Sequence, residues 1–252
     1  MTESIFYQKE YTVGLHDVDF FNELKFSKLF HYFQETASLA ASVLGAGIEK
    51  LAKNDGIAWI LMKIKVEVNR MPEQGEKIII ETWPQPPGRI AIERDFIVKD
   101  RKGHVFIRAV SSWILMDLNE RKIKRTSAVD LSYPFVNTER ALEHTFKKLK
   151  SSSGFMPVYE KTVGGSDIDF NGHLNNSEYI RYILNCFSRE EHKEFQLETL
   201  EINYIEEAFL QEVIVLKTDG QLNKEAVLSI EGMKKESKKP VFRGVLTTKK
   251  RF

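Results

Sequence analysis

Apolar and polar residues follow two different periods along this chain, and the changes between them predict the secondary structure. From Met62 to Asn69 apolar and polar residues alternate, which is typical of a strand with one buried face. Turn residues separate this segment from three further apolar runs that we predict to be strands: 77–83, 90–98 and 104–116. The apolar residues before these strands are spaced as on one face of a helix: Leu29, Phe30, Phe33 and Ala37. The pattern therefore predicts one helix followed by an antiparallel meander.

The same order of elements is predicted again in the C-terminal part of the chain. Four residues form the apolar stripe of a second helix: Tyr179, Ile180, Ile183 and Phe187. Strands are predicted to follow near four segments: 199–205, 212–218, 226–232 and 241–248. The stretch between the halves is less regular, with a short charged helix predicted from Thr138 to Leu149. We therefore divide the chain into an N-terminal unit (1–130), a linker (131–158) and a C-terminal unit (159–252).

An internal repeat supports this division. When the chain is shifted by 150 positions, nine of the 22 residues from Tyr11 to Tyr32 are identical to those from Lys161 to Tyr182. Random pairing would give roughly one or two identities at ordinary residue frequencies. Two copies of one helix-plus-sheet unit is the economical interpretation, because each sheet needs a partner for its apolar face.

The second copy of the repeat carries the candidate chemistry. Asp169, Asn171 and His173 alternate, so in an extended backbone their side chains leave the same face. Asn175 or Asn176 is suited to cap the helix that follows, where unpaired N–H groups favour an anion. We interpret this acid, amide and imidazole at a helix start as a candidate active site.

The first copy differs from the second at the two positions that matter for chemistry. Phe21 stands where the second copy has Asn171, and Glu23 stands where it has His173. If the amide and the imidazole were needed only to build the turn, both copies should carry them. The comparison therefore assigns the chemistry to the C-terminal unit.

Composition narrows the class of protein. The net charge of +1 argues against a strongly basic nucleic-acid-binding protein. With Cys186 as its single cysteine, the chain forms no internal disulfide, which suits a reducing compartment. The residues from Met1 to Glu10 lack the apolar segment of a signal peptide, and no apolar stretch is long enough to span a bilayer. We expect a cytoplasmic protein with neither a nucleic-acid nor a membrane partner.

The segment from Asp167 to Tyr179, with the pattern D-x-D-x-N-x-H-x-N-N-x-x-Y, resembles the active-site segment of acyl-acyl carrier protein thioesterases. This family occurs in bacteria and in plant plastids. Further segments follow the family's order: Trp59–Leu61, Arg70–Pro72, Glu81–Trp83 and Arg108–Trp113. The resemblance covers nearly the whole chain and weakens in the linker and the last strand.

The resemblance implies an α+β double-hotdog fold, in which each unit has a long helix wrapped by a curved antiparallel sheet. It implies hydrolysis of the thioester of acyl-acyl carrier protein, which releases free fatty acid in fatty acid biosynthesis. The implied partner is the acyl carrier protein with its phosphopantetheine-linked acyl chain, and a homodimer is one option for the assembly. No metal or organic cofactor is implied.

The resemblance also implies a set of site residues. The catalytic set would be Asp169, Asn171, His173 and Glu207, with Glu206 one residue away as the alternative acid. Glu207 would be the base, Asn171 would hold the water, and His173 would polarise the carbonyl or protonate the thiolate. Asp169 would fix the tautomer of His173 or orient Asn171. Amides near Asn175 and Asn176 could bind the oxyanion.

The resemblance further implies that the N-terminal unit lines the acyl tunnel, where Ala58, Ile60 and Met62 would set the chain length, with core packing as the alternative role for these residues. Plant members commonly carry a cysteine just after the acid, where this chain has Ala208, so a cysteine nucleophile has no candidate in the site. Two alternatives stay open: an acyl-CoA thioesterase of the same fold, and a non-catalytic module that binds an acyl group or a carrier protein.

Overall fold

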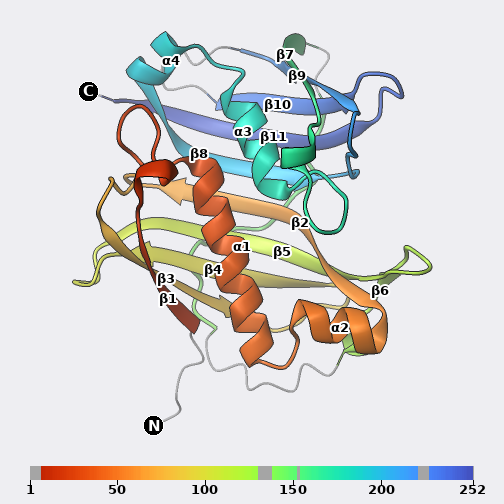
Figure 1. The fold of residues 1–252 in the computed structure, drawn as a ribbon. Coiled ribbons are helices and arrows are strands. Elements are labelled where there is room, and N and C mark those ends of the chain that lie inside the picture. The colour runs from red at the N-terminus through yellow and green to blue at the C-terminus, as the bar shows by residue number, and fades with distance from the viewer. Residues whose placement is uncertain (1–6, 130–137, 152–153, 221–226, 252) are drawn as a thin grey trace. The chain divides into compact units, whose positions relative to one another are not determined.

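The computed structural model describes residues 7–129, 138–151, 154–220 and 227–251. These residues group into two compact units, one of 1–64 with 69–145 and one of 65–68 with 146–252 (Figure 1). The first part of the predicted linker, 131–137, lies outside the described ranges. So does Ala226, the first residue of one predicted strand.

The N-terminal unit is an antiparallel sheet with one long helix. Its strands are β1 (Tyr7–Thr12), β2 (Ile57–Val68), β3 (Lys77–Pro84), β4 (Ala91–Lys99), β5 (Val105–Asp117) and β6 (Ile123–Lys124). We count β2 with this unit because eight of its twelve residues, 57–64, belong to it. They follow the order β1-β3-β4-β5-β2, and β6 pairs with β5. The predicted meander is therefore right for β3, β4 and β5 but wrong for β2, which lies beside β5 because β1 pairs with the other edge of β3. Its helices are α1 (Phe26–Val43) and α2 (Ile48–Asp55), with single 3-10 turns at Leu15–Asp17 and Thr126–Ala128.

Helix α1 lies across the sheet of its own unit (Figure 1). The four residues of the predicted stripe are all buried: Leu29, Phe30, Phe33 and Ala37. The ring of Phe33 packs 4.7 Å from that of Phe96 on β4, measured between centroids. Burial of large apolar side chains of this kind is the main force that holds a helix on a sheet, because each removes apolar surface from water.

The C-terminal unit repeats this plan. Its strands are β7 (Met156–Thr162), β8 (Phe195–Tyr204), β9 (Val213–Thr218), β10 (Val227–Lys234) and β11 (Pro240–Lys250), in the order β8-β11-β10-β9-β7. All four neighbouring pairs are antiparallel. Helices α3 (Asn176–Leu184) and α4 (Arg189–Glu194) follow a 3-10 turn at Gly165–Asp167. The predicted plan of one helix-plus-sheet unit in each half is thus confirmed.

The helix of the C-terminal unit is shorter than its apolar stripe predicts. Helix α3 ends at Leu184, so Phe187 is buried in the turn that follows it. Ser188 starts a new helix there, because its hydroxyl accepts a hydrogen bond from the Glu191 N–H while the Glu191 carboxylate accepts one from the Ser188 N–H. Because of this reciprocal cap, the chain begins α4 after Ser188 and does not extend α3 to Phe187.

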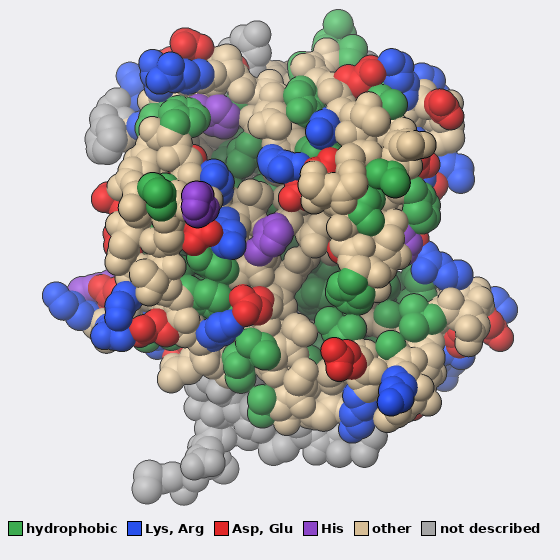
Figure 2. Space-filling model, in the orientation of Figure 1, with side chains coloured by type: hydrophobic (Ala, Val, Ile, Leu, Met, Phe, Trp, Pro, Cys, Tyr) green, Lys and Arg blue, Asp and Glu red, His purple; other side chains and the backbone are tan. Residues whose placement is uncertain are grey.

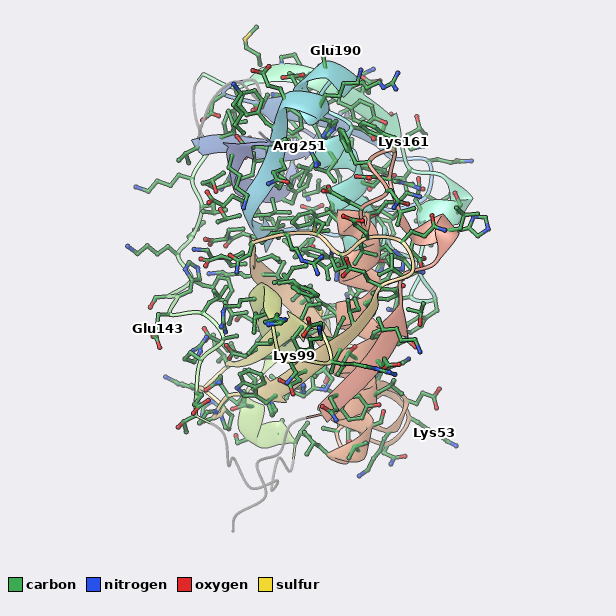
Figure 3. All side chains as sticks on the ribbon, turned by 90° about the vertical axis from the view of Figure 1, so that its left-hand side faces the viewer. Lys53, Lys99, Glu143, Lys161, Glu190 and Arg251 are labelled. Carbon is green, nitrogen blue, oxygen red and sulfur yellow. The ribbon has the colours of Figure 1, made fainter. Side chains whose placement is uncertain are left out.

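The helix predicted from Thr138 to Leu149 is wrong, because this segment carries no helix. Its backbone groups bond to side chains of the sheets instead. The Ala141 N–H donates to Asp95 Oδ1 over 2.8 Å, and the Glu139 carbonyl accepts from Trp83 Nε1 over 2.9 Å. Exposed Glu143 points away from the sheet (Figure 3). Charge and spacing favoured a helix, but buried sheet side chains compete for the groups that a helix would pair.

Charged side chains of both signs are interspersed on the face shown in Figure 2. None of the helices in the described ranges is long and apolar enough to cross a membrane.

Candidate active site

The loop before α3 is built around one carboxylate. Asp169 Oδ1 accepts hydrogen bonds from the N–H groups of Asn171 over 2.8 Å and His173 over 3.3 Å. The Asp169 N–H donates to the His173 carbonyl over 2.8 Å, and Gly172 completes the turn with a φ of +80°. A short acidic side chain that accepts from amides two and four residues further on fixes the backbone of such a turn.

The loop before α1 has the same backbone. Asp19 Oδ1 accepts from the N–H groups of Phe21 over 2.8 Å and Glu23 over 3.2 Å. The Asp19 N–H donates to the Glu23 carbonyl over 2.8 Å, and Asn22 takes the place of Gly172 with a φ of +65°. The turn therefore forms equally well without the amide of Asn171 or the imidazole of His173.

A second carboxylate, that of Asp167, ties the start of the C-terminal loop to helix α3. Asp167 is buried and accepts from the Tyr182 hydroxyl over 2.7 Å and from the Gly164 N–H over 2.9 Å, while Arg181 Nη2 lies 2.5 Å away. Burial acts to raise the pKa of Asp167, but these partners outweigh it and hold the pKa below its usual value. In the first copy, Asp17 binds Gly14 and Tyr32 in the same way.

The imidazole of His173 lies beside one of the two candidate acids. Its Nδ1 is 3.3 Å from Glu207 Oε1, within ion-pair distance. Both side chains are partly open to solvent, His173 at 22% and Glu207 at 29% exposure. The neighbouring Glu206 is paired elsewhere, because its Oε1 lies 3.3 Å from Lys234 Nζ. Of the two acids that sequence left open, Glu207 is the one that contacts the histidine.

Glu207 precedes a residue whose carbonyl accepts a hydrogen bond from the loop, and the N-terminal unit has an equivalent hydrogen bond. The Leu174 N–H donates to the carbonyl of Ala208, directly after Glu207, over 2.8 Å. In the N-terminal unit, the Leu24 N–H donates to the carbonyl of Pro72 over 2.7 Å. Met71 therefore stands where the C-terminal unit has Glu207, so the first loop lacks the acid as well as the amide and the imidazole.

Asn171 is exposed, and its Nδ2 lies 3.4 Å from Asp169 Oδ2. Of the two roles predicted for Asp169, orienting Asn171 is the one for which a side-chain contact exists, since Nδ1 of His173 faces Glu207 instead. Sequence reasoning did not select Phe209, whose ring meets the His173 ring edge to face at 5.1 Å. Its position two residues after Glu207 was the only signal.

The two asparagines at the start of α3 have different surroundings. Asn175 is the cap, because its Oδ1 accepts from the Ser177 N–H over 2.9 Å and its own N–H donates to the Asp167 carbonyl over 2.9 Å. The Asn176 carbonyl accepts from the Tyr204 hydroxyl over 3.1 Å. This arrangement leaves the Asn176 N–H, at the first position of α3, outside the cap.

The remaining predicted residues lie apart from this loop in sequence. Ala58, Ile60 and Met62 are half-buried on β2 of the N-terminal unit, and a role for them in contacting an acyl chain stays a prediction. Cys186 follows α3, and burial raises the pKa of its thiol to about 12. Ala208, where a cysteine would follow the acid, is fully buried.

The assembled groups suit attack by water on an activated carbonyl. A carboxylate beside one nitrogen of an imidazole stabilises the protonated ring, so the other nitrogen can take up and return a proton. In the described part of the chain, Nε2 of His173 has no hydrogen-bond partner that would oppose this. The exposed amide of Asn171 and the Asn176 N–H, which lies outside the cap of α3, provide donors within three residues of His173 in the chain.

Comparison with known proteins identifies the family. The chain matches the model of the acyl-ACP thioesterase N-terminal domain over residues 4–129 and that of the C-terminal domain over residues 156–243. It is similar to the crystal structure of an acyl-ACP thioesterase from Bacteroides thetaiotaomicron, with a TM-score of 0.87, 27% identity and coverage of 97% of this chain and 98% of that one. The structure of the 12:0-ACP thioesterase from Umbellularia californica has the same fold, with a TM-score of 0.80 at 17% identity and 98% coverage of both chains.

Curated plant relatives are longer than this chain. It is 24% identical to a chloroplastic oleoyl-acyl carrier protein thioesterase of Coriandrum sativum, over 90% of this chain and 66% of the relative. It is 25% identical to a chloroplastic acyl-[acyl-carrier-protein] hydrolase of Cuphea viscosissima, over 90% of this chain and 58% of the relative. The chain thus spans less than two thirds of the length of these relatives. The family predicted from sequence is confirmed, as is its α+β fold.

Proposed function

Because the chain belongs to the acyl-ACP thioesterase family, we propose that it hydrolyses the thioester of acyl-acyl carrier protein and releases free fatty acid in fatty acid biosynthesis. One observation carries the proposal to this chain. The two loops have the same backbone conformation, and of the two only the C-terminal loop holds an imidazole within 3.3 Å of a carboxylate. That pair is the difference between a scaffold and a site that can move a proton.

We assign the proton transfer to His173, with Glu207 acting through it. Sequence analysis gave the role of base to Glu207, but the contact with Nδ1 supports a different division. The Glu207 carboxylate holds the proton on Nδ1, so the lone pair is on Nε2, which takes a proton from the attacking water. The carboxylate then stabilises the imidazolium that this transfer forms.

The rest of the cycle returns that proton. Water oxygen bonds to the carbonyl carbon, and the negative charge moves to the carbonyl oxygen, where the Asn176 N–H at the start of α3 donates to it. When the intermediate collapses, the carbon–sulfur bond breaks and the Nε2 proton goes to the departing thiolate. The products are a free carboxylic acid and the thiol of the phosphopantetheine arm, and the enzyme regains its starting charge.

Asn171 and Asp169 position the water in this proposal. The Asn171 side chain is exposed at the loop surface, where its amide can hold the water, and Asp169 restrains it through the contact of 3.4 Å with Nδ2. Asp169 also fixes the backbone of His173 through its N–H. Holding a nucleophile in place in this way lowers the entropic cost of the reaction.

Turnover of one acyl group on two carriers tests the proposal. The purified protein should hydrolyse acyl-acyl carrier protein with a higher kcat/KM than the matching acyl-CoA, across a series of saturated acyl groups. Preference for acyl-CoA would favour the acyl-CoA thioesterase of the same fold, and no turnover of either substrate would favour a non-catalytic module.

Variants test the assigned roles. His173→Ala should lower kcat by about 10²–10⁴-fold, the usual contribution of an acid–base group. Glu23→Ala, at the matching position of the other loop, is the control and should leave kcat unchanged. Glu207→Gln should keep more activity than His173→Ala if Glu207 acts through the imidazole. A Glu207→Gln enzyme that is as inactive as His173→Ala would return the role of base to Glu207.

We also propose, from the sequence alone, that the protein forms a homodimer and is located in the cytoplasm. Sedimentation equilibrium of the purified protein checks the first, since a monomer at all concentrations would contradict it. Fractionation of the cells that make the protein checks the second.

A further inference from the structure

A buried lysine lies behind the candidate acid. Lys234, the last residue of β10, has a side chain that is only 9% exposed. Its Nζ lies 3.3 Å from Glu206 Oε1, 3.0 Å from Glu212 Oε1 and 5.2 Å from the centroid of the Phe209 ring. A lysine is rarely buried unless its charge is paired, and this one is paired with two carboxylates and an aromatic face.

These three partners belong to the segment that carries Glu207. The segment from Ile205 to Glu212 links β8 to β9 without regular structure. The Ile205 N–H donates to the Val241 carbonyl over 2.9 Å, and the Phe209 N–H donates to Glu212 Oε2 over 2.9 Å. Lys234 therefore joins both ends of the segment, since it pairs with Glu206 near one end and with Glu212 at the other.

The segment delivers two groups to His173. Glu207 Oε1 lies 3.3 Å from Nδ1, and the Phe209 ring packs against the imidazole edge to face at 5.1 Å. Each of these residues neighbours a partner of Lys234 or is one itself. Glu206 and Glu207 are adjacent in the chain, and pairing the first with Lys234 leaves the second to face the histidine.

From this geometry we propose that Lys234 is a positioning residue of the site, which holds Glu207 and Phe209 against His173. It does not touch the substrate, because its charge is enclosed by its three partners. The proposal rests on the proposed function, and it deepens that function by adding a residue that acts through the carboxylate and the ring. Supporting groups of this kind fix the geometry of catalytic side chains.

Three variants separate this role from a general effect of charge. Lys234→Met keeps the length of the side chain but removes the charge, so Glu206 and Glu212 lose their buried partner. Lys234→Arg keeps the charge. Lys239→Met is the matched control, because Lys239 Nζ lies 3.6 Å from the same Glu206 oxygen but its side chain is 63% exposed.

The expected result is a loss in kcat. Lys234→Met should lower kcat on acyl-acyl carrier protein by about ten- to a hundredfold with KM changed less than about twofold, since a displaced catalytic group slows the reaction more than it weakens binding. Lys234→Arg should recover most of that loss, and Lys239→Met should match the wild type. An unchanged kcat in Lys234→Met would overturn the proposal.

A double-mutant cycle distinguishes positioning from loss of folded protein. In a Glu207→Gln background, Lys234→Met should lower kcat by less than about twofold further, because residues that act through one another are not additive. The same fold loss in both backgrounds would mean that Lys234 does not act through Glu207, which would overturn the proposal. If Lys234→Met does not fold, Glu212→Gln, which weakens the same ion pair, takes its place in the cycle.

A readout without turnover separates this proposal from the proposed function. The imidazole Cε1–H signal of His173, assigned by its absence in His173→Ala, is recorded by NMR at one fixed pH. It should shift in Lys234→Met and stay in place in Lys239→Met. A wild-type protein that hydrolyses no thioester would defeat the proposed function, whereas an active wild type with an unshifted His173 signal in Lys234→Met would defeat the role of Lys234.

Discussion

Asp19 and Asp169 accept the same pair of backbone hydrogen bonds, with lengths that agree within 0.1 Å: 2.8 and 3.2 Å for Asp19, and 2.8 and 3.3 Å for Asp169. The two residues therefore build one turn twice in the same chain. Only Asp169 has an asparagine and a histidine on the residues that it holds. The N-terminal loop is thus an internal control for the C-terminal one, because it has the scaffold without the chemistry.

Alanine substitution of these two residues should have equal effects on stability and unequal effects on activity. In Asp19→Ala and in Asp169→Ala two backbone N–H groups lose their acceptor, so each should lower the free energy of unfolding by about 1–3 kcal/mol. Only Asp169→Ala should lower kcat, because it also releases Asn171 and His173. Urea unfolding and turnover on acyl-acyl carrier protein measure the two quantities.

Asp19→Ala is the control for any loss of folded protein in Asp169→Ala. If both variants lost the same fraction of kcat, the turn would affect activity only through stability, and the assignment of Asp169 to the site would be wrong.

Sequence was sufficient for the parts of the fold and the site that depend on local pattern. The helical stripe after Asp169, Asn171 and His173 placed these residues at a helix start. The extended backbone that their alternation predicted is wrong, because Asp169 accepts hydrogen bonds from the N–H groups of Asn171 and His173 and folds the segment into a turn. The repeat separated Asn171 and His173 from the scaffold without any coordinates. The helix prediction succeeds because the period of a helix is a property of the chain itself.

Sequence was insufficient where distant residues decide the outcome. Glu206 and Glu207 are identical in type and adjacent, and Lys234 on one side and His173 on the other give them different partners. The segment at 138–149 has helical composition, yet Asp95 and Trp83 on the sheet hold its backbone in another form. Both cases depend on contacts between residues far apart in the chain, which no local period encodes.

Replacement of Gly172 by asparagine should be tolerated, whereas replacement by valine should not. Gly172 has a φ of +80°, and no atom lies within 4 Å of where its Cβ would be, so backbone conformation is the main constraint. Asn22 already occupies the matching position at +65°. Gly172→Val should cost about 1–3 kcal/mol of stability, since a β-branched residue is strained there.

Thermal unfolding and kcat of Gly172→Asn and Gly172→Val check this prediction. The asparagine variant should stay close to the wild type in both measurements. Equal losses for the two variants would show that the space around the loop, and not its backbone angle, requires glycine.

Asp167 should make the C-terminal unit sensitive to acid. Despite its burial, its hydrogen bonds and the Arg181 guanidinium hold the pKa of its carboxyl below the usual value in the folded chain. A carboxyl group with a depressed pKa contributes stability above its unfolded pKa of about 3.9, and this contribution is lost as pH falls through the lower folded pKa. The free energy of unfolding should therefore be steady from neutral pH to about pH 5 and fall below about pH 4.

Asp167→Asn should be less stable than the wild type at neutral pH and should lose less stability on acidification, because the amide does not titrate. Denaturant unfolding at a series of pH values measures this difference. Asp55→Asn, at an exposed position of α2, is the control and should keep the wild-type dependence. An unchanged acid dependence in Asp167→Asn would show that other carboxylates are responsible.

Cys186 should be dispensable for turnover and slow to react with alkylating reagents. Burial raises the pKa of its thiol to about 12, so little thiolate is present at neutral pH, and the thiolate is the nucleophile. The thiol also donates to the Tyr182 carbonyl of α3 over 3.4 Å. Cys186→Ala should therefore keep the wild-type kcat, and iodoacetamide treatment at neutral pH should leave the wild type active. His173→Ala, treated in parallel, provides the inactive reference. Rapid inactivation of the wild type, with Cys186→Ala protected from it, would show that the thiol is exposed near the site and would reopen a cysteine nucleophile.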